Sequence, residues 1–402
     1  MVKTPWVGLS LRILALKAAC GSALCCLVLV LGSSHAKAQE PASLEIEQCF
    51  QVIDVRELEH PESHPTPAAS NRHGEAIKSA TIQESTADVE PQLIQSWSDR
   101  IKFHGLLQAW YLSGDQGFND TFRVRRAELK FVGDASPAIK WTVMVDPAKA
   151  LSLANSVRIL QDAFITLSYH NRLHLNVGRF KVPLSLEGLQ SSAELDTERA
   201  LFSSDRSRGG TYGDVRDIGV MTYGALTDRV DFQLGFFDLS GDTPNNLGTH
   251  QKAAAGRVVY RPAFLPGLQV GSSGVRGNGT TVEHSHRHRS GAELLYLKGP
   301  TTLKAEYMTG KDGLLERKGH YLHFAYKLTP QWESILRYDT WDPDVDLERT
   351  AASVTERDYI VGFNYFIHGS HVNLQFNYVR KTFEDDIVSP ANLAVLRLQA
   401  FW

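Results

Sequence analysis

The chain has few cysteines, and it has no long apolar run after residue 38. Three of the four cysteines in its 402 residues, Cys20, Cys25 and Cys26, lie before residue 38, so only Cys49 is left if that segment is removed. One thiol cannot form an internal disulfide, which excludes a disulfide-stapled secreted module. No stretch after residue 38 approaches about 18 consecutive apolar residues, so we expect no transmembrane helix there.

Recognisable catalytic motifs are also missing. The chain has no Gly-x-Ser-x-Gly nucleophile turn, no His-Glu-x-x-His pair and no Gly-rich phosphate loop. The sequence therefore predicts no enzyme, no catalytic residue, no cofactor and no metal. "EHSHRHR" does place His284, His286 and His288 on one side of an extended segment, which makes a zinc or pH-sensing site conceivable. A polar outer loop is the favoured interpretation of this stretch.

The first 38 residues have the pattern of a secretory signal peptide. Basic residues precede an apolar run of 14 residues, 18–31, and Ala36–Ala38 offers an Ala-x-Ala cleavage site. That run is shorter than the about 20 residues that span a membrane as a helix, so an uncleaved anchor is the weaker alternative. Residues 39–97 hold eleven acids against three bases and lack periodicity, which predicts an acidic, flexible periplasmic extension.

The charge of the remaining chain bears on its partners. Without residues 1–38, 38 basic residues stand against 45 acidic ones, a net charge of −7. This balance argues against nucleic acid as a partner.

From residue 101 onward, apolar and polar residues alternate with a period of two, as in strands with one apolar and one polar face. In "HVNLQFNYV", for example, Val372, Leu374 and Phe376 alternate with Asn373 and Gln375. Sixteen such segments are predicted, at about 100–112, 121–133, 138–147, 158–170, 172–182, 216–224, 229–239, 252–261, 267–276, 288–298, 301–309, 318–328, 331–341, 356–367, 371–381 and 391–402.

The connections between these segments alternate in length. Short connections fall at 170–172, 226–228, 299–300, 329–330 and 368–370. Long ones lie between them, notably 183–215, 240–251, 277–287 and 342–355. Strict alternation over an even number of strands predicts an all-β fold, a sixteen-stranded antiparallel transmembrane β-barrel over 98–402 with short periplasmic turns and long outer loops. Tyr residues near strand ends on the apolar face, such as Tyr260, Tyr307 and Tyr378, fit aromatic girdles facing lipid, and the polar face predicts a wet interior.

One stretch resembles a known family. "GRFKVPLSLE", 178–187, resembles the Gly-x-Phe-Lys-x-Pro-x-Ser-x-Glu motif of the phosphate-selective porin O and P family, with matches at Gly178, Phe180, Lys181, Pro183, Ser185 and Glu187. Further similar elements follow in the family's order at 216–220, 255–258, 291–293, 299–300, 305–307, 377–378 and 397–399.

The resemblance implies a sixteen-stranded porin in the outer membrane of a Gram-negative bacterium. It further implies that the chain forms a homotrimer and passes small hydrophilic solutes, anions such as phosphate among them, by passive diffusion. It also implies that the loop after the fifth strand, 183–215, folds into the barrel and narrows it. Two other readings stay open: a structural or adhesive barrel, and a barrel-embedded lipid hydrolase in which His323 and Ser334 would have to meet.

Anion selectivity requires surplus cations in the narrow part of a pore. Alternation places ten cations and nine carboxylates in the lumen, so the count by itself predicts no basic funnel, and pairing across strands is the favoured role for most of these charges. The best selectivity candidates are Arg126, Lys130, Arg257, Arg261, Lys304 and Arg337 on strands and Arg199, Arg206 and Arg208 in the long loop.

The stretch "NLAVLRLQAFW" predicts a final strand that pairs with the first strand and closes the barrel, because an unpaired edge in lipid leaves backbone groups unsatisfied. Leu396, Leu398 and Trp402 are expected to face lipid, and Arg397 and Gln399 to face inward. Phe401 and Trp402 resemble the signal that the barrel-assembly machinery reads. The expected partners are thus outer-membrane lipid, that machinery, small ions or solutes and further copies of the chain.

Overall fold

The computed structural model describes residues 100–116, 118, 120–151, 158–238, 252–278, 286–347, 350–385 and 387–402. The predicted signal peptide (1–38) and acidic extension (39–97) lie outside these residues. So do Cys49, His284 and the side chain of His286.

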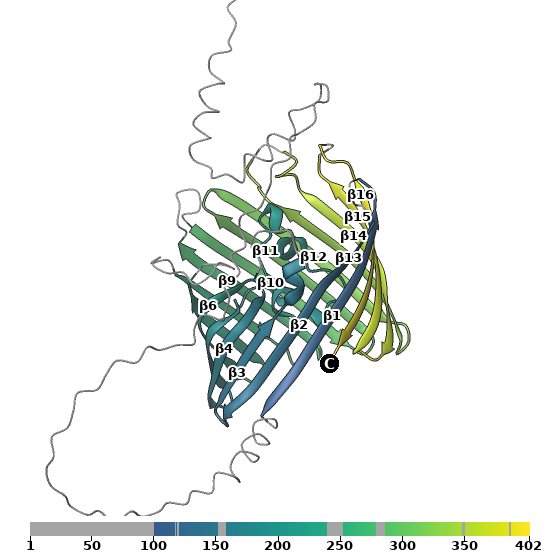
Figure 1. The fold of residues 1–402 in the computed structure, drawn as a ribbon. Helices are drawn as coiled ribbons and strands as arrows, with labels where there is room; N and C mark the ends of the chain where they lie inside the picture. The colour runs from purple at the N-terminus through teal and green to yellow at the C-terminus, as the bar shows by residue number, and fades with distance from the viewer. Residues whose placement is uncertain are drawn as a thin grey trace, which may run out of the picture. The chain divides into compact units, whose positions relative to one another are not determined.

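In this part of the chain, sixteen strands form one closed antiparallel barrel in which each strand pairs with its neighbours in sequence and β1 pairs with β16 (Figure 1). The predicted fold is confirmed. The strands are β1 Ile101–Gly114, β2 Thr121–Ser136, β3 Ile139–Val145, β4 Leu160–His170, β5 Leu173–Lys181, β6 Arg216–Thr227, β7 Val230–Phe237, β8 Ala253–Tyr260, β9 Leu268–Asn278, β10 His286–Lys298, β11 Thr301–Asp312, β12 Leu315–Lys327, β13 Trp332–Asp342, β14 Glu356–His368, β15 Val372–Phe383 and β16 Ala391–Phe401.

Short helices occupy two connections. The segment after β3 contains η2 Pro147–Leu151, and the segment after β5 contains α4 Leu186–Leu189, η3 Ser192–Glu194, α5 Leu201–Ser204 and η4 Arg206–Arg208. No helix in the described ranges is long and apolar enough to cross a membrane.

One predicted connection is wrong. The sequence pattern places a loop at 310–317, but β11 runs to Asp312 and β12 begins at Leu315, so a two-residue turn joins them on the side of the long connections. Gly313 adopts a φ of 65°, which glycine tolerates at little cost. Arg317 also bonds to Asp312 at 2.6 Å, so cross-strand charge pairs extend the hairpin beyond the apolar alternation.

The closing seam between β1 and β16 is formed as expected. The backbone N–H of Gly105 donates to Trp402 O at 2.9 Å, and that of Trp402 donates to Gly105 O at 3.0 Å. Leu398 is 49% exposed on the outer face, whereas Arg397 and Gln399 are buried on the inner one. The pairing leaves no open sheet edge at this position.

Aromatic rings gather on the outer face in two zones along the strands. Toward the long connections, a row of rings crosses four strands: Tyr307 lies 6.4 Å from His320, which lies 5.8 Å from Tyr338, which lies 5.2 Å from Tyr359. At the other end, Trp332 and Tyr365 pack at 4.7 Å. Two belts of this kind are expected of a wall that crosses a membrane.

The barrel interior is not wet throughout, which corrects the prediction from alternation. On the side of β5 to β13, inward side chains form a dry apolar cluster with the long connection 182–215. Its members are Phe180, Val182, Leu184, Ala200, Leu201, Phe202, Tyr212, Met221, Phe237, Ala253, Ala255, Val275, Met308, Tyr321 and Trp341. A two-residue alternation in the strands cannot reveal this cluster, because part of it consists of apolar side chains from the connection 182–215 that pack against the inner face of the strands.

Candidate permeation pathway

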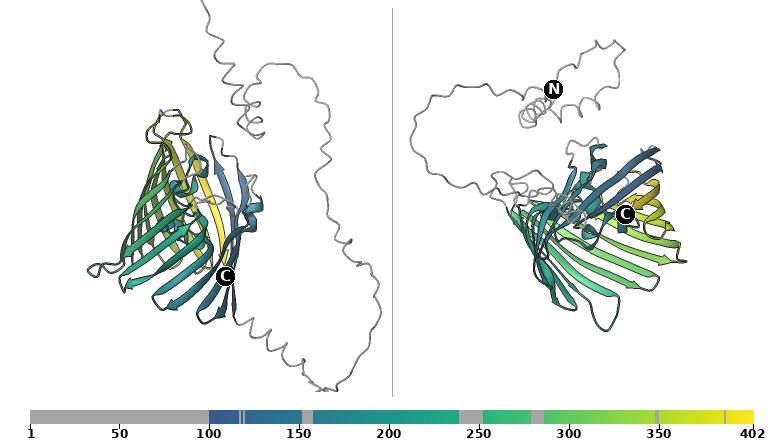
Figure 2. Two further views of the ribbon diagram at one scale, coloured as in Figure 1. Left: turned by 90° about the vertical axis from the view of Figure 1, so that its left-hand side faces the viewer. Right: turned by 60° about the horizontal axis from the view of Figure 1, so that its bottom comes forward.

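The connection 182–215, which we call the constriction loop, folds into the barrel as the family resemblance implies (Figures 1 and 2). The backbone oxygen of Leu195 accepts from Arg397 Nη2 at 2.5 Å and from Gln375 Nε2 at 3.3 Å, on β16 and β15. Nearby on the same side of the barrel, the backbone N–H of Leu201 donates to Asp339 on β13. These contacts hold the loop against the wall at β13, β15 and β16.

The family motif marks where this loop leaves the wall. Gly178 has a φ of 132°, and a Cβ there would lie 2.3 Å from the carbonyl oxygen of Ala163. Only glycine allows the chain to turn at this point. Two residues later, the Phe180 ring packs 5.6 Å from Phe164 and 5.5 Å from Phe237, which ties the loop base into the apolar cluster.

Ser185 fixes the next turn, in a backbone conformation that is unusual for serine, with a φ of 71°. Its Oγ accepts from Gly188 N at 2.9 Å and caps α4, and it also donates to Glu306 Oε2 at 3.2 Å. The backbone N–H groups of Leu186 and Glu187 donate to the same carboxylate at 2.6 Å and 3.0 Å. Glu306 on β11 thus holds the start of α4 with three hydrogen bonds.

Glu187 makes the strongest link across the lumen. Its carboxylate forms a bidentate pair with Arg337 on β13, at 2.7 Å and 3.0 Å, and Arg337 also contacts Asp339 at 3.0 Å. Burial alone would raise the pKa of Glu187, but the attraction of Arg337 outweighs it and lowers the pKa to about 2. The loop is thereby bound to the wall as a charged pair at neutral pH.

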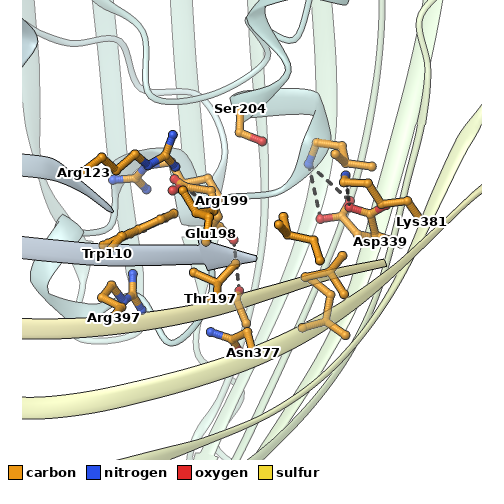
Figure 3. Close-up of a pocket in the computed structure, with 17 residues that line it drawn as sticks. Trp110, Arg123, Thr197, Glu198, Arg199, Ser204, Asp339, Asn377, Lys381 and Arg397 are labelled. Atoms are coloured by element: carbon orange, nitrogen blue, oxygen red, sulfur yellow. Dashed lines mark hydrogen bonds and ion pairs between the residues drawn. The ribbon is translucent and has the colours of Figure 1, made fainter. Parts of the chain in front are cut away.

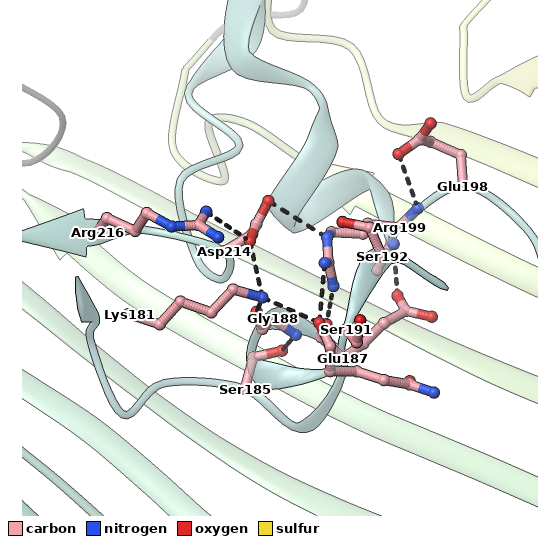
Figure 4. A network of polar contacts seen from close by, with 12 residues as sticks. Lys181, Ser185, Glu187, Gly188, Ser191, Ser192, Glu198, Arg199, Asp214 and Arg216 are labelled. Atoms are coloured by element: carbon pink, nitrogen blue, oxygen red, sulfur yellow. Dashed lines mark hydrogen bonds and ion pairs between the residues drawn. The ribbon is translucent and has the colours of Figure 1, made fainter. Parts of the chain in front are cut away.

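Asp214, near the end of the loop, collects three cations (Figure 4). Lys181 approaches its carboxylate at 3.1 Å, and Arg199 and Arg216 each approach at 3.3 Å. Burial opposes ionisation, but Lys181, Arg199 and Arg216 together hold the pKa of Asp214 well below its usual range. Lys181 also donates to the carbonyl of Gly188 at 2.8 Å, so the two ends of the loop are joined.

Three cavities follow one another beside the loop. An outer cavity of about 780 Å³ opens toward the long connections, an inner one of about 720 Å³ toward the short turns, and a narrow one of about 140 Å³ lies between them. The outer and narrow cavities share Arg125, Glu198 and Ser204 as lining residues. The narrow and inner cavities share Ser192 and Arg216, among others. The shared lining residues place the three cavities one after another, and we take them as the candidate path through the barrel.

The narrow cavity has a surplus of positive charge. Its cationic lining residues are Arg125, Arg126, Lys149, Arg199, Arg206 and Arg216. Its acidic lining residues are Glu128, Asp146, Glu198 and Asp214. Six cations against four carboxylates leave two positive charges among the lining residues, one of which Asp162 offsets through its pair with Arg216. In a small cavity between low-dielectric walls, the remaining surplus acts more strongly than in open water.

A β-bulge creates part of this surplus. In the pairing of β1 with β2, Gln108 lies opposite Arg126 and Ala109 lies opposite Val124, so Arg125 is an extra residue in β2. A bulge breaks the two-residue period, and both Arg125 and Arg126 consequently point inward. Both arginines reach Glu198 of the constriction loop, at 3.3 Å and 3.1 Å. Burial opposes ionisation of Glu198, but these two arginines lower its pKa.

Further arginines surround Trp110 on β1, beside a small enclosed cavity of about 170 Å³ (Figure 3). The guanidinium carbons of Arg123, Arg125 and Arg397 lie 4.7 Å, 5.7 Å and 5.6 Å from the centre of the Trp110 ring. Stacking on an indole disperses the charge of a guanidinium and holds its plane in place. This corner of the barrel is therefore also positively charged.

The predicted selectivity residues are not all in the pathway. Arg126, Arg199 and Arg206 line the narrow cavity, Lys130 lines the inner one and Arg208 the outer one. These five residues line the cavities of the candidate path, and their role in selectivity stays a prediction.

The other four predicted residues lie elsewhere. Arg257 and Lys304 line a side cavity of about 610 Å³. Arg337 is buried and anchors the loop, and it lines none of the three cavities of the path. Arg261 follows β8 at the short-turn end, where it pairs with Asp231. The structure thus brings these residues to three separate places.

Sequence reasoning missed Arg125, Lys149 and Arg216 as lining residues. The signal for Arg125 was its charge, because strict alternation from Arg126 would turn Arg125 toward lipid, where an arginine costs about 2–4 kcal/mol at mid-membrane. Lys149 lies in η2, where no strand period applies. Arg216 begins β6 and bonds to Asp162 at 2.7 Å.

Other candidate features are not assembled into sites. His288 Nδ1 accepts from Arg276 Nη1 at 2.7 Å on the outer face. Within the described ranges, no group of three or more His, Cys, Asp or Glu side chains could hold a metal ion.

Solved structures with a similar fold are porins and outer-membrane channels. An anion-selective porin from Comamonas acidovorans matches with a TM-score of 0.56 and 11% identity, over 75% of this chain and 99% of that one. OmpF of Salmonella typhi matches with a TM-score of 0.59 and 11% identity, over 75% and 97%. The outer membrane channel DcaP of Acinetobacter baumannii matches with 0.54 and 11%, over 75% and 97%. A closed sixteen-stranded barrel narrowed by an inserted loop defines an outer-membrane diffusion channel.

The sequence identifies the family within this class. The profile of the phosphate-selective porin O and P family matches residues 108–278 and 266–400. The chain belongs to this family and is an outer-membrane porin for the passive diffusion of small solutes. A comparison with curated proteins found no match.

Proposed function

We propose that this porin favours small hydrophilic anions, inorganic phosphate among them, and that the narrow cavity sets the preference. The observation that carries the proposal is the lining of that cavity, with six cationic side chains against four carboxylates. A surplus of fixed charge in a constriction concentrates counter-ions and repels ions of its own sign. The even balance of the whole lumen matters less, because charge acts most strongly where the path is narrowest.

The loop carboxylates in the narrow cavity are each shared by more than one cation, so they neutralise only part of the positive charge around them. Glu198 is shared between Arg125 and Arg126. Asp214 is likewise shared among three cations. A permeating anion would accept hydrogen bonds from guanidinium groups that are already oriented by these contacts.

The experiment is the reversal potential of purified protein in planar bilayers under a salt gradient. We expect an anion-selective potential, and a shift toward cations in Arg125→Gln/Arg126→Gln/Arg206→Gln. The matched control is Arg357→Gln/Arg380→Gln, two arginines that bond to Glu384 and Asn392 and line none of the three cavities. Equal potentials for the triple variant and the unmodified porin would refute the role of the narrow cavity.

Phosphate is tested separately by influx into liposomes. We expect phosphate to enter proteoliposomes faster than a cation of similar size, with the difference abolished in the triple variant. Ohmic conductance with no preference for any ion would support a general porin instead. The absence of conductance from folded protein would favour the alternative of a structural or adhesive barrel.

We also propose a homotrimer that reaches the outer membrane after signal-peptide cleavage and assembles there with the barrel-assembly machinery. Support for the trimer comes from the family and from the likeness to OmpT of Vibrio cholerae in its trimer form, with a TM-score of 0.52 and 12% identity. Light scattering in detergent gives the mass of the assembly, and a monomeric mass would contradict this part. Mass spectrometry of the N-terminus locates the cleavage site, which we expect after Ala38.

We further propose that the barrel has no enzymatic activity. A lipid hydrolase would require His323 and Ser334 to meet, but His323 is buried inside the barrel, 3.2 Å from Asp196. Ser334 donates to the carbonyl of Tyr326 on the outward face. Hydrolysis of phospholipid by purified protein, abolished by Ser334→Ala, would overturn this conclusion.

A further inference from the structure

A row of cations crosses the outer face of the barrel at the long-loop end of β9 to β12. Arg276 on β9 lies opposite His288 on β10, which lies opposite Lys311 on β11, and Lys318 on β12 lies opposite Thr309. We call Arg276, Lys311 and Lys318 the outer basic row. None of these three cations lines any of the cavities of the path, so permeation does not explain them.

The alternation of exposure shows that this row points away from the lumen. Val275, next to Arg276, is buried, and so are Asp312, next to Lys311, and Tyr321, which lies on the inner face of β12. The side chains of Lys311 and Lys318 are 47% and 49% exposed. In a membrane-spanning barrel, this face meets lipid or the layer directly above the lipid.

The aromatic row fixes the height of these cations. Lys311 follows Tyr307 by four residues on the same strand face, so it lies about 14 Å farther along the strand and about 10 Å farther along the membrane normal at the usual tilt. Aromatic rings sit at the edge of the hydrocarbon, and the headgroup layer adds about 5–8 Å on each side. The backbone of Lys311 therefore lies slightly beyond that layer, and its long flexible side chain can reach back to the headgroups.

The charge of the row is only partly compensated. Lys311 pairs with Glu316 at 2.9 Å, and Lys318 lies 3.8 Å from the buried Asp342, at the limit of an ion pair. The Arg276 guanidinium donates to His288 Nδ1 at 2.7 Å, and no carboxylate among the described residues pairs with it. The outward face at this level thus retains positive charge. Arg276 on β9 and Lys311 on β11 are separated by one strand, and adjacent strands are about 4.8 Å apart, so these two cations are about 10 Å apart.

We propose that the outer basic row binds the phosphorylated headgroup of a lipid in the outer leaflet. The chemistry is that of several cations, spaced across neighbouring strands, facing one headgroup with more than one phosphate. Arginine offers paired N–H donors to phosphate oxygens, and the lysines add point charges. Such binding would hold a lipid annulus against β9 to β12 and stabilise the barrel from outside, independently of which solute passes through it.

The test compares lipid binding with and without the row. Purified full-length protein in detergent is mixed with lipopolysaccharide, with enzymatically dephosphorylated lipopolysaccharide, or with inorganic phosphate at matched ionic strength, and the thermal midpoint of the barrel is followed. We expect phosphorylated lipid alone to raise the midpoint. In Arg276→Gln/Lys311→Gln/Lys318→Gln we expect the apparent affinity to fall by about tenfold or more, with conductance unchanged.

A matched control removes two lysines and one arginine at the short-turn end, in Lys140→Gln/Arg172→Gln/Lys298→Gln. The side chains of Lys140 and Arg172 are 54% and 52% exposed. This variant should bind lipopolysaccharide as the unmodified porin does. If the row variant fails to form a heat-resistant barrel, the single variant Lys318→Gln should still show a measurable loss of affinity.

Three results would overturn the proposal. One is equal stabilisation of the row variant and the unmodified porin by lipopolysaccharide. Another is undiminished stabilisation by the dephosphorylated lipid, which would assign the effect to acyl chains. The last is full stabilisation by inorganic phosphate alone, which would assign the row to free phosphate. Each is separable from a failure of anion selectivity, because that is measured in the pore.

Discussion

Arg337 on β13 reaches the constriction loop and grips Glu187 with two parallel hydrogen bonds, 2.7 Å and 3.0 Å long. Both side chains are buried, and Arg337 stacks 4.1 Å from the centre of the Tyr321 ring. The pair spans the interior and gives the loop its fixed place beside the path. It is the contact whose loss should change the channel most directly.

Arg337→Ala should therefore loosen the loop. Removing one partner of a buried pair leaves the other charge uncompensated, which costs about 3–5 kcal/mol. We expect a larger and noisier single-channel conductance, and a lower temperature for the loss of the heat-resistant band on mildly denaturing gels. The double variant Glu187→Leu/Arg337→Met, which leaves no lone buried charge, should recover most of the stability. Unchanged conductance in Arg337→Ala would mean that other contacts hold the loop.

The depressed pKa values of loop carboxylates predict an acid-resistant constriction. The pKa of Glu187 falls from 4.5 to about 2 on folding, and that of Asp214 also lies well below its usual value. A depressed carboxyl pKa contributes stability above the unfolded value and loses it as pH falls toward the folded one. We expect the stability that the Glu187–Arg337 pair contributes, measured as the difference in thermal midpoint between the unmodified porin and Glu187→Leu/Arg337→Met, to stay constant from neutral pH to about 4.5 and to fall between about 4.5 and 2. A difference that already shrinks between pH 7 and pH 5 would contradict this window.

Gly178→Ala should prevent correct folding of the loop base. A Cβ would lie 2.3 Å from the Ala163 carbonyl oxygen, in a backbone conformation with a φ of 132°. The unfavourable backbone conformation alone costs about 1–3 kcal/mol. The overlap of the new Cβ with rigid backbone atoms adds to that cost. The matched control is Gly299→Ala, where φ is 58° and nothing lies within 4 Å of the added atom. The yield of heat-resistant barrel should fall sharply for the first variant and only slightly for the second.

Deleting Arg125 tests the bulge directly. Without the extra residue, Val124 and Arg126 would follow strict alternation, so every other residue of β2 keeps its face. We expect a folded barrel whose reversal potential in a tenfold salt gradient moves toward cations, within the limit of about 59 mV for a monovalent ion. Arg125→Gln should give the same shift with the bulge retained. Loss of assembly on deletion, with normal assembly of Arg125→Gln, would show that the bulge itself is needed for the fold.

Trp402→Ala should weaken the closing seam. The Trp402 ring covers Gly105, where a Cβ would lie only 2.2 Å from the ring, and it lies 6.4 Å from the Phe103 ring. Aromatic contacts of this kind contribute about 0.5–1.5 kcal/mol each. We expect slower barrel assembly into lipid vesicles, followed by the appearance of the heat-resistant band, and normal conductance once assembled. Tyr260→Ala, on the same face of β8, should assemble at the usual rate.

The strand positions followed from the sequence because lipid and water impose opposite requirements on neighbouring residues. In β16, the alternation of Leu396 and Leu398 with Arg397 and Gln399 specified the lipid face, and the structure agrees. The family motif likewise located the start of the loop, since Gly178 and Ser185 occupy backbone conformations with positive φ.

The narrow cavity could not be derived in the same way. Alternation misplaces Arg125, because a bulge of one residue reverses the face and the local pattern marks it only by an arginine at a position that alternation assigns to lipid. Pairing was expected across strands, yet Arg126, Lys304 and Arg337 bind carboxylates of the constriction loop. Partners this far apart in sequence meet only once the barrel has closed.

The sequence by itself determined a sixteen-stranded barrel, because period-two alternation and turn spacing are local properties of the chain, and the family resemblance indicated the segment that narrows it. Only the tertiary structure decided which cations face the path, which of them anchor the loop, and where the interior is dry. Those outcomes depend on how residues 182–215 pack across the lumen, and on a register shift between β1 and β2. Both are set by contacts between distant segments, on which a local period carries no information.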